Sequence, residues 1–248
     1  MELTVVIVTV LAFVMSFVFA LGGIGSALAL VPVLHWYGLP LDLARPTGLL
    51  VNTLSMTGAS VDNIRNRRLD FKMGVPIILA SGLTAPLGVW ATRLISHELV
   101  IYIFVSFLFF SALMLLFFKG RGGQDGYRED RPLLLPALIG GCAGLLSGLL
   151  GVGGGGLISP LLIMMGFNPK KVAAITAFVV PFSSIIAFTA YSLMGTVEWM
   201  ILLPAALAAY AGGLLGTRFM HKKMKPGRVK KFLGVVLLVL ALKMLTMV

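Results

Sequence analysis

The charged residues of this chain fall into a few short clusters, and the stretches between the clusters are almost entirely apolar. Only 12% of the residues are charged, whereas a soluble domain carries roughly 25%. A helix of about 20 residues spans the hydrocarbon core of a bilayer, which is about 30 Å thick. The spacing therefore predicts an all-α polytopic membrane protein, with long windows at 3–21, 43–62, 73–92, 98–118, 132–150, 171–194, 197–219 and 229–247, and shorter ones at 24–37 and 155–167.

Other compositional features exclude several classes of protein. We do not expect the first window to be a cleaved signal peptide, because MELTVV carries no positive charge and the apolar stretch is too long. The single cysteine, Cys142, excludes an internal disulfide and a cysteine-built metal site. The net charge of +11 would suit a nucleic-acid binder, but the cations lie in loops between the windows. We therefore expect lipid as the partner, no nucleic acid, no metal and no cofactor.

The two halves of the chain resemble each other after a shift of about 128 residues. This shift pairs Pro32 with Pro160 and Gly38 with Gly166. The polar stretch KGRGGQDGYREDR at 119–131 lies at the seam. The pattern predicts a duplication, and each half alone would expose its packing face. We expect a single integral domain made of a first transmembrane repeat at 1–118, a linker at 119–131 and a second repeat at 132–248.

The positions of the basic residues indicate how the halves are oriented. If the glycine-broken units at 3–37 and 132–167 each enter and leave on one side, all but three of the 20 Lys and Arg residues share one face. If each unit crossed once, the cations would divide almost equally. Because Lys and Arg prefer the cytoplasmic side, we expect two inverted-topology repeats, each a glycine-broken helical hairpin plus three transmembrane helices. Both termini are expected outside and the linker in the cytoplasm; the three exceptions are Arg45, Arg93 and Lys243.

The glycine-rich segments LGGIGS (21–26) and GVGGGG (151–156) are the predicted turns of these hairpins. Lipid permits irregular backbone only where protein or water surrounds it. Glycine allows the positive φ values and the close approach that such a turn needs. Because a helix start carries about half a positive charge, two turns from inverted halves predict an anion site near the midplane. A purely architectural role is the alternative.

Other glycine patterns have a simpler explanation. GxGxxG at 151–156 lacks the preceding strand and the later acidic residue of a dinucleotide site. Glycines at four-residue spacing are assigned to close helix packing, and they are Gly140, Gly144, Gly148, Gly212 and Gly216.

The duplicated pattern of a glycine turn, a proline about nine residues later, a glycine and then a hydroxyl residue resembles the TauE/SafE family of sulfite and organosulfonate exporters. It reads GGIGSALALVPVLHWYG with Thr47 in the first half, and GVGGGGLISPLLIMMG with Thr176 in the second. The first turn departs from the family's richer glycine run at Ile24 and Ser26. The resemblance covers nearly the whole chain. It implies a carrier of a bacterial or archaeal inner membrane that exports sulfite, sulfoacetate or other organosulfonates.

The candidate substrate-binding residues lie in the two turns and on the helices that follow them. Asn52 is the most informative, because a buried amide can donate two hydrogen bonds to a sulfite or sulfonate oxygen. An interhelical hydrogen bond is an equally good explanation. Serines and threonines are weaker candidates, since they can bond back to their own helix. The full set is Gly22, Gly23, Gly25, Ser26, Thr47, Asn52, Ser55, Gly151, Gly153, Gly154, Gly155, Thr176, Ser183 and Ser184.

Three arginines near the ends of the windows are expected to have two different roles. Arg45, just before Pro46, is expected at the outer mouth, where it attracts or releases an anion; the alternative is that it extends to the interface. Arg93 and Arg218 occupy matching positions of the repeat, and we expect them to anchor helix ends at the interface.

Three function classes follow from these features. The first is an anion exporter that works by alternating access between inverted repeats. The second is a carrier or channel for another small anion, a cation or a neutral solute, and a cation would need a ring of carboxylates or carbonyls. The third is a membrane enzyme or assembly factor, which would show His, Asp or Glu clustered at one depth, whereas the histidines are scattered at 35, 97 and 221. We expect the exporter and no enzyme activity, with a small anion as partner; a homodimer is left open.

The sequence also bears on the driving force. No carboxylate lies deep in a window, so no buried proton relay is expected. Export of an anion down an outward-positive potential gains about 2.3 kcal/mol per charge per 100 mV, which is sufficient. Proton coupling through His35 or Asp62 remains the alternative.

Overall fold

The computed structural model describes the chain except residues 1, 118–129, 131–132, 196, 224–225 and 246–248. The predicted linker at 119–131 therefore lies, apart from Asp130, outside the described residues. The described part contains ten helices and no strand, so the all-α prediction is confirmed. The helices are α1 (Glu2–Ala20), α2 (Ala27–Trp36), α3 (Leu41–Arg65), α4 (Phe71–Ala91), α5 (His97–Phe117), α6 (Leu134–Leu150), α7 (Gly155–Met164), α8 (Pro169–Ser192), α9 (Trp199–Lys223) and α10 (Pro226–Leu245).

The surface of the bundle is apolar. Large side chains such as Leu83 and Leu207 are 77% and 70% exposed, and contiguous exposed apolar surface of this kind is typical of a face turned toward another apolar phase. Among the described residues, four helices are long and apolar enough to cross a membrane by length and composition, namely α4, α5, α8 and α9. These features are those of a multi-pass membrane protein.

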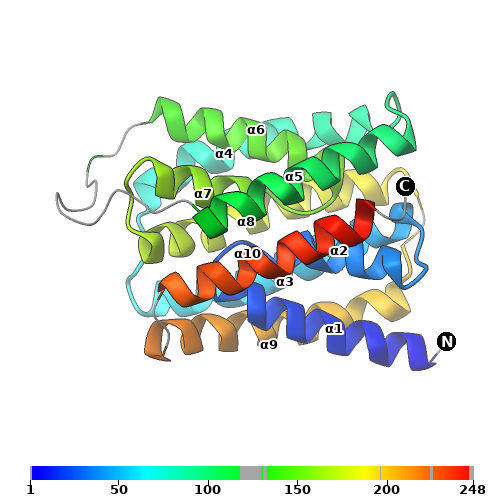
Figure 1. Cartoon of the computed structure of the whole chain (residues 1–248), viewed down its shortest axis with the longest axis horizontal. Helices are drawn as coiled ribbons and strands as arrows, with labels where there is room; N and C mark the ends of the chain where they lie inside the picture. Colours follow the sequence, from blue (N-terminus) through cyan, green and yellow to red (C-terminus); the bar gives the residue numbers. More distant parts are fainter. Residues whose placement is uncertain (1, 118–129, 131–132, 196, 224–225, 246–248) are drawn as a thin grey trace.

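The helix axes lie roughly side by side along the long dimension of the molecule (Figure 1). The start of α1 and the end of α10 lie at the right-hand edge, and the end of α5 and the start of α6 lie at the left. The left-hand edge is called the basic end below, because its helix termini and the turn at 66–70 carry Arg65, Arg67, Arg68, Lys72, Lys170, Lys171, Arg218, Lys222 and Lys223. The other edge is called the opposite end.

The two halves share their backbone breaks. Within the described residues, positive φ angles occur at glycines in the same three places of each half, separated by 128 positions. Such φ values favour glycine because it lacks a Cβ. The pairs are Gly23 (64°) with Gly151 (72°), Gly25 (94°) with Gly153 (73°), and Gly38 (95°) with Gly166 (93°).

Helices of one half pack directly against helices of the other. A Cβ added at Gly148 of α6 would overlap the carbonyl oxygen of Ala85 on α4. In the same way, a Cβ at Gly216 of α9 would overlap the carbonyl oxygen of Phe17 on α1. Small residues allow backbones to approach this closely in a membrane. The packing role predicted for the spaced glycines is confirmed, and similar overlaps are found at Gly140, Gly144 and Gly212.

A matched pair of substitutions on α6 tests this packing. Gly148→Ala should destabilise the protein by about 1–3 kcal/mol, because the added methyl group meets backbone that cannot move aside. Gly141→Ala is the control, since its Cβ would lie 3.8 Å from Thr84 Cγ2 in ordinary contact. The measurement is the thermal midpoint of the purified protein in detergent. Equal midpoints for the two variants would contradict the packing.

Candidate functional site

The two glycine turns are buried and touch each other in the interior. The first turn, at 21–26, joins α1 to α2, and the second, at 151–154, joins α6 to α7. A Cβ added at Gly155 would overlap the carbonyl oxygen of Ile24, so the backbones of the two hairpins are in direct contact. Gly155 therefore occupies a position at which a side chain has no room.

Each turn also lies against the long helix of the other half. A Cβ at Gly23 would meet the backbone of Ala173 on α8, at a distance of 2.6 Å from its Cα. A Cβ at Gly151 would meet Arg45 on α3, 3.0 Å from its Cα. Ala173 and Arg45 are themselves 128 positions apart, so the same contact is made twice with the halves exchanged.

The turns leave a set of backbone N–H groups without acceptors. Within the described residues, the N–H groups of residues 152–156 donate no hydrogen bond, and the first donors of α7 are Leu157 and Ile158. The N–H groups of Gly25, Ser26 and Leu28 also lack acceptors in the described part of the chain. These residues are all buried. A buried unpaired N–H costs about as much as a lost hydrogen bond, and each helix start adds a partial positive charge.

The side chain of Asn52 lies between the two turns. Its Nδ2 donates to Ser184 Oγ of α8 at 2.9 Å, and its Oδ1 lies 3.4 Å from the N–H of Ala27 at the start of α2. A Cβ at either Gly25 or Gly153 would overlap the Asn52 amide. The structure thus brings Asn52, Ser184, Gly25 and Gly153 together, and the interhelical hydrogen bond given above as the alternative role of Asn52 is present.

The remaining hydroxyl candidates divide into two groups. Thr47 Oγ1 donates to Leu43 O at 2.7 Å, and Ser183 Oγ donates to Val180 O at 3.2 Å. Both bonds lie within the residue's own helix, as expected for such side chains. These two hydroxyls are therefore already paired with backbone.

The second group makes contacts between helices or none. Thr176 Oγ1 accepts from Ser159 Oγ of α7 at 3.0 Å. Ser159 was not a candidate, although it lies one residue before the repeat's Pro160. Ser26 and Ser55 are fully buried, and their hydroxyl oxygens have no partner among the described residues.

Two glycines of the candidate set lie at the edges of the turns. Gly22 is half-buried, and Gly154 lies against Ala143 of α6.

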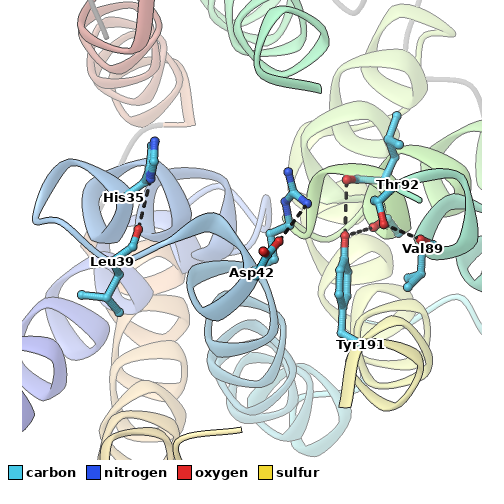
Figure 2. Close-up of polar contacts among 9 residues, drawn as sticks. His35, Leu39, Asp42, Val89, Thr92 and Tyr191 are labelled. Carbon is cyan, nitrogen blue, oxygen red and sulfur yellow. Dashed lines mark hydrogen bonds and ion pairs between the residues drawn. The ribbon is translucent and has the colours of Figure 1, made fainter. Parts of the chain in front are cut away.

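Arg45 is buried against the second turn, with an exposed fraction of only 4%. The extension to the interface that sequence offered as an alternative is therefore wrong. Its Nη1 forms a long ion pair with Oδ1 of Asp42 at 4.0 Å (Figure 2). Its Nε has no partner in the described part. Asp42 itself is 89% exposed. Arg45 thus places a weakly compensated cation between the opposite end and the turns.

Tyr191 lies one residue before the end of α8, toward the same end (Figure 1), and was missed by sequence reasoning. Its hydroxyl donates to Gly148 O at 2.8 Å, just before α6 breaks at the second turn. Nearby, Thr92 Oγ1 donates to Val89 O at 2.7 Å. His35 Nδ1 lies 3.1 Å from Leu39 O (Figure 2).

An ion-pair cluster lies at the basic end. Asp62 Oδ2 accepts from Arg68 Nη1 at 3.0 Å, and Asp62 Oδ1 accepts from Arg218 Nε at 2.9 Å. Asp62 is only 3% exposed. Arg218, expected to anchor a helix end at the interface, lies five residues before the end of α9 with its side chain 42% exposed, and it also pairs with the buried carboxylate. Sequence could not show this, because the two residues are 156 positions apart.

The sequence profile of the family described as "Sulfite exporter TauE/SafE" matches residues 8–244. "Probable membrane transporter protein YunE" of Bacillus subtilis (strain 168) is 26% identical over 265 residues, which cover 97% of this chain and 97% of that protein. "Probable membrane transporter protein MJ0441" of Methanocaldococcus jannaschii is 26% identical over 95% of this chain and 93% of its own.

A plant relative matches only part of the chain. "Sulfite exporter TauE/SafE family protein 1" of Arabidopsis thaliana is 38% identical over 125 residues, which cover 49% of this chain and 27% of the plant protein. Since the family profile extends from α1 to α10, this chain belongs to the sulfite exporter TauE/SafE family of membrane transporters.

Proposed function

We propose that this protein exports small sulfur-containing anions, such as sulfite, sulfoacetate or other organosulfonates, by alternating access between two inverted repeats. The observation that carries the proposal is the set of buried backbone N–H groups at the two turns that find no acceptor among the described residues. An oxyanion can accept several of these bonds at once, and its charge complements two helix starts. A cation would be repelled by the same groups.

The arrangement of the halves supports the inverted repeats. In Figure 1, α1 begins at the opposite end and α2 returns toward it, whereas α6 begins at the basic end and α7 returns there. The positive φ glycines recur at the same spacing in both hairpins. Residues 1–118 and 132–248 would then rock against each other around the turns as one domain. The positive-inside preference assigns the basic end to the cytoplasm of a cell inner membrane, and both termini to the outside.

The buried face of α3 supports a route through the protein. Arg45, Asn52 and Ser55 are 4%, 0% and 0% exposed, and Asp62 near the end of α3 is 3% exposed. At 100° per residue, these four positions fall within an arc of about 100°. One polar face of α3 therefore runs from the opposite end, past the turns, to the basic end. The membrane potential favours movement of an anion outward along it.

A charge substitution at Asn52 tests the anion site. Asn52→Asp keeps the size of the side chain but places a carboxylate between the turns, and repulsion of a nearby anion should lower sulfite efflux about tenfold or more. The control is Asn168→Asp, because Asn168 caps α8 by accepting from Lys170 N at 2.9 Å, which a carboxylate also does. Efflux from loaded proteoliposomes is the measurement.

Efflux by the Asn168→Asp protein should stay within about twofold of the parent, since the cap is kept. Equal efflux by the Asn52→Asp protein and the parent would contradict an anion site between the turns.

Single-cysteine labelling tests the topology. In a Cys142→Ser background, cysteines at Lys72 and Lys223 should react with an impermeant reagent from the same side, and a cysteine at Arg93 from the other. All three positions are exposed. The inverted arrangement requires this division, because it places α4 and α9 in opposite directions. Labelling of Lys72→Cys and Lys223→Cys from different sides would refute it.

A further inference from the structure

A basic hollow lies at the basic end, where the turn after α3 meets the starts of α4 and α8. Its volume is about 530 Å³, and its charged lining residues are Arg67, Arg68, Lys72, Lys171 and Asp70. Lys171 Nζ forms an ion pair with Asp70 Oδ2 at 3.0 Å. Four cations against one carboxylate leave the hollow positive. Such a lining concentrates small anions from the adjoining solution.

Arg68 links this hollow to the buried carboxylate of Asp62. The Arg68 side chain is 29% exposed and lines the hollow, while that of Asp62 is only 5% exposed. Asp62 is held from the other side by Arg218 of α9. Arg68, Asp62 and Arg218, called the triad below, therefore connect the turn after α3 to α3 and α9. A solvent anion can reach Arg68 without first displacing α9.

Buried polar groups that have no partner among the described residues lie on α3 and α9, within three residues of Asp62 or Arg218. Asn63 Oδ1, Thr217 Oγ1 and His221 Nε2 are buried and have no hydrogen-bond partner within the described ranges. Thr217 lies four residues after Gly213, whose added Cβ would overlap Ser55 O, so Thr217 is on the face of α9 that meets α3. Unpaired buried polar groups are costly. Entry of water or of an anion between α3 and α9 would supply their partners.

We propose that the basic hollow binds the sulfur-containing oxyanion before transport, and that the bound anion opens the triad by competing with Asp62 for the Arg68 guanidinium. A sulfonate presents several oxygens to one guanidinium, as the Asp62 carboxylate does. Loss of the Arg68 bond leaves Asp62 with Arg218 alone and loosens the α3–α9 contact. The identity of the anion rests on the proposed function; the hollow, the triad and their connection do not.

The test uses a buried cysteine as a reporter of opening. Thr217→Cys is made in a Cys142→Ser background, because Thr217 is only 1% exposed and cysteine is close to it in size. The full-length protein is placed in phosphatidylcholine nanodiscs, and its reaction with a water-soluble maleimide is followed at constant ionic strength, adjusted with sodium chloride. Sulfoacetate should raise the labelling rate about threefold or more, the scale of losing one partly exposed ion pair.

Variants of the triad separate its role from a general effect of charge. Asp62→Asn should label rapidly without sulfoacetate and show no further increase with it. Arg68→Gln keeps the Arg218 bond and should label at an intermediate rate, again without a response. Glu198→Gln is the matched control, because it also removes one carboxylate, at an exposed position just before α9 at the opposite end; it should label slowly and keep its response. Asn63→Cys provides a second reporter if a variant of Thr217 fails to insert.

Anionic lipid headgroups carry the same phosphate-like chemistry as a free oxyanion, and a second arm separates the two. In nanodiscs containing phosphatidylglycerol, sulfoacetate should still accelerate labelling. Acceleration by phosphatidylglycerol with none by sulfoacetate would overturn the proposal, as would slow labelling of Asp62→Asn. The readout involves no flux, so a protein that transports sulfite but shows no labelling response overturns this inference alone. A labelling response without sulfite efflux contradicts the proposed function instead.

Discussion

Backbone N–H groups inside a membrane protein need a partner, since lipid offers none. In this chain the two glycine turns lie against each other, and both carry N–H groups that lack such a partner. Residues 152–156 and the start of α2 have buried N–H groups without acceptors in the described structure. Glycine at 155 lets the second hairpin touch Ile24 of the first. The long helices α3 and α8 then hold the turns through Arg45 and Ala173. The close packing of the halves thus serves to bring two positive helix starts together.

The two ends of the molecule differ although the halves share a pattern. Asp62 and Tyr191 are 129 positions apart, the same separation as Ser55 and Ser184. Asp62 binds two arginines at the basic end, whereas Tyr191 donates a neutral hydrogen bond to Gly148 O toward the opposite end. Ion pairs respond to an arriving anion more strongly than a hydrogen bond between neutral groups. Because the ion pairs lie at the basic end, this asymmetry favours first contact between the anion and the protein at that end.

Sequence predicted the helices well, because apolar windows and charge clusters follow the length that a membrane requires. It placed the breaks at both glycine turns, and it paired positions 128 apart, which the φ angles of Gly23 and Gly151 bear out. It singled out Asn52, because a buried amide must find partners. The hydroxyl groups were less predictable: Thr47 bonds to its own helix and Ser184 to Asn52, and only the packed structure distinguishes them. The burial of Arg45 and the Asp62–Arg218 pair depend on contacts between halves, which local pattern does not contain.

The proposed function requires the backbone of the two turns to hold the transported anion. The most direct measurement is anomalous diffraction from crystals of the protein grown with selenite, whose selenium marks the position of a sulfite-like oxyanion. An anomalous peak is expected beside the turns, with selenite oxygens about 2.7–3.2 Å from N–H groups of residues 152–156, Gly25, Ser26 and Leu28. A well-occupied peak elsewhere in the protein, with none between the turns, would contradict it.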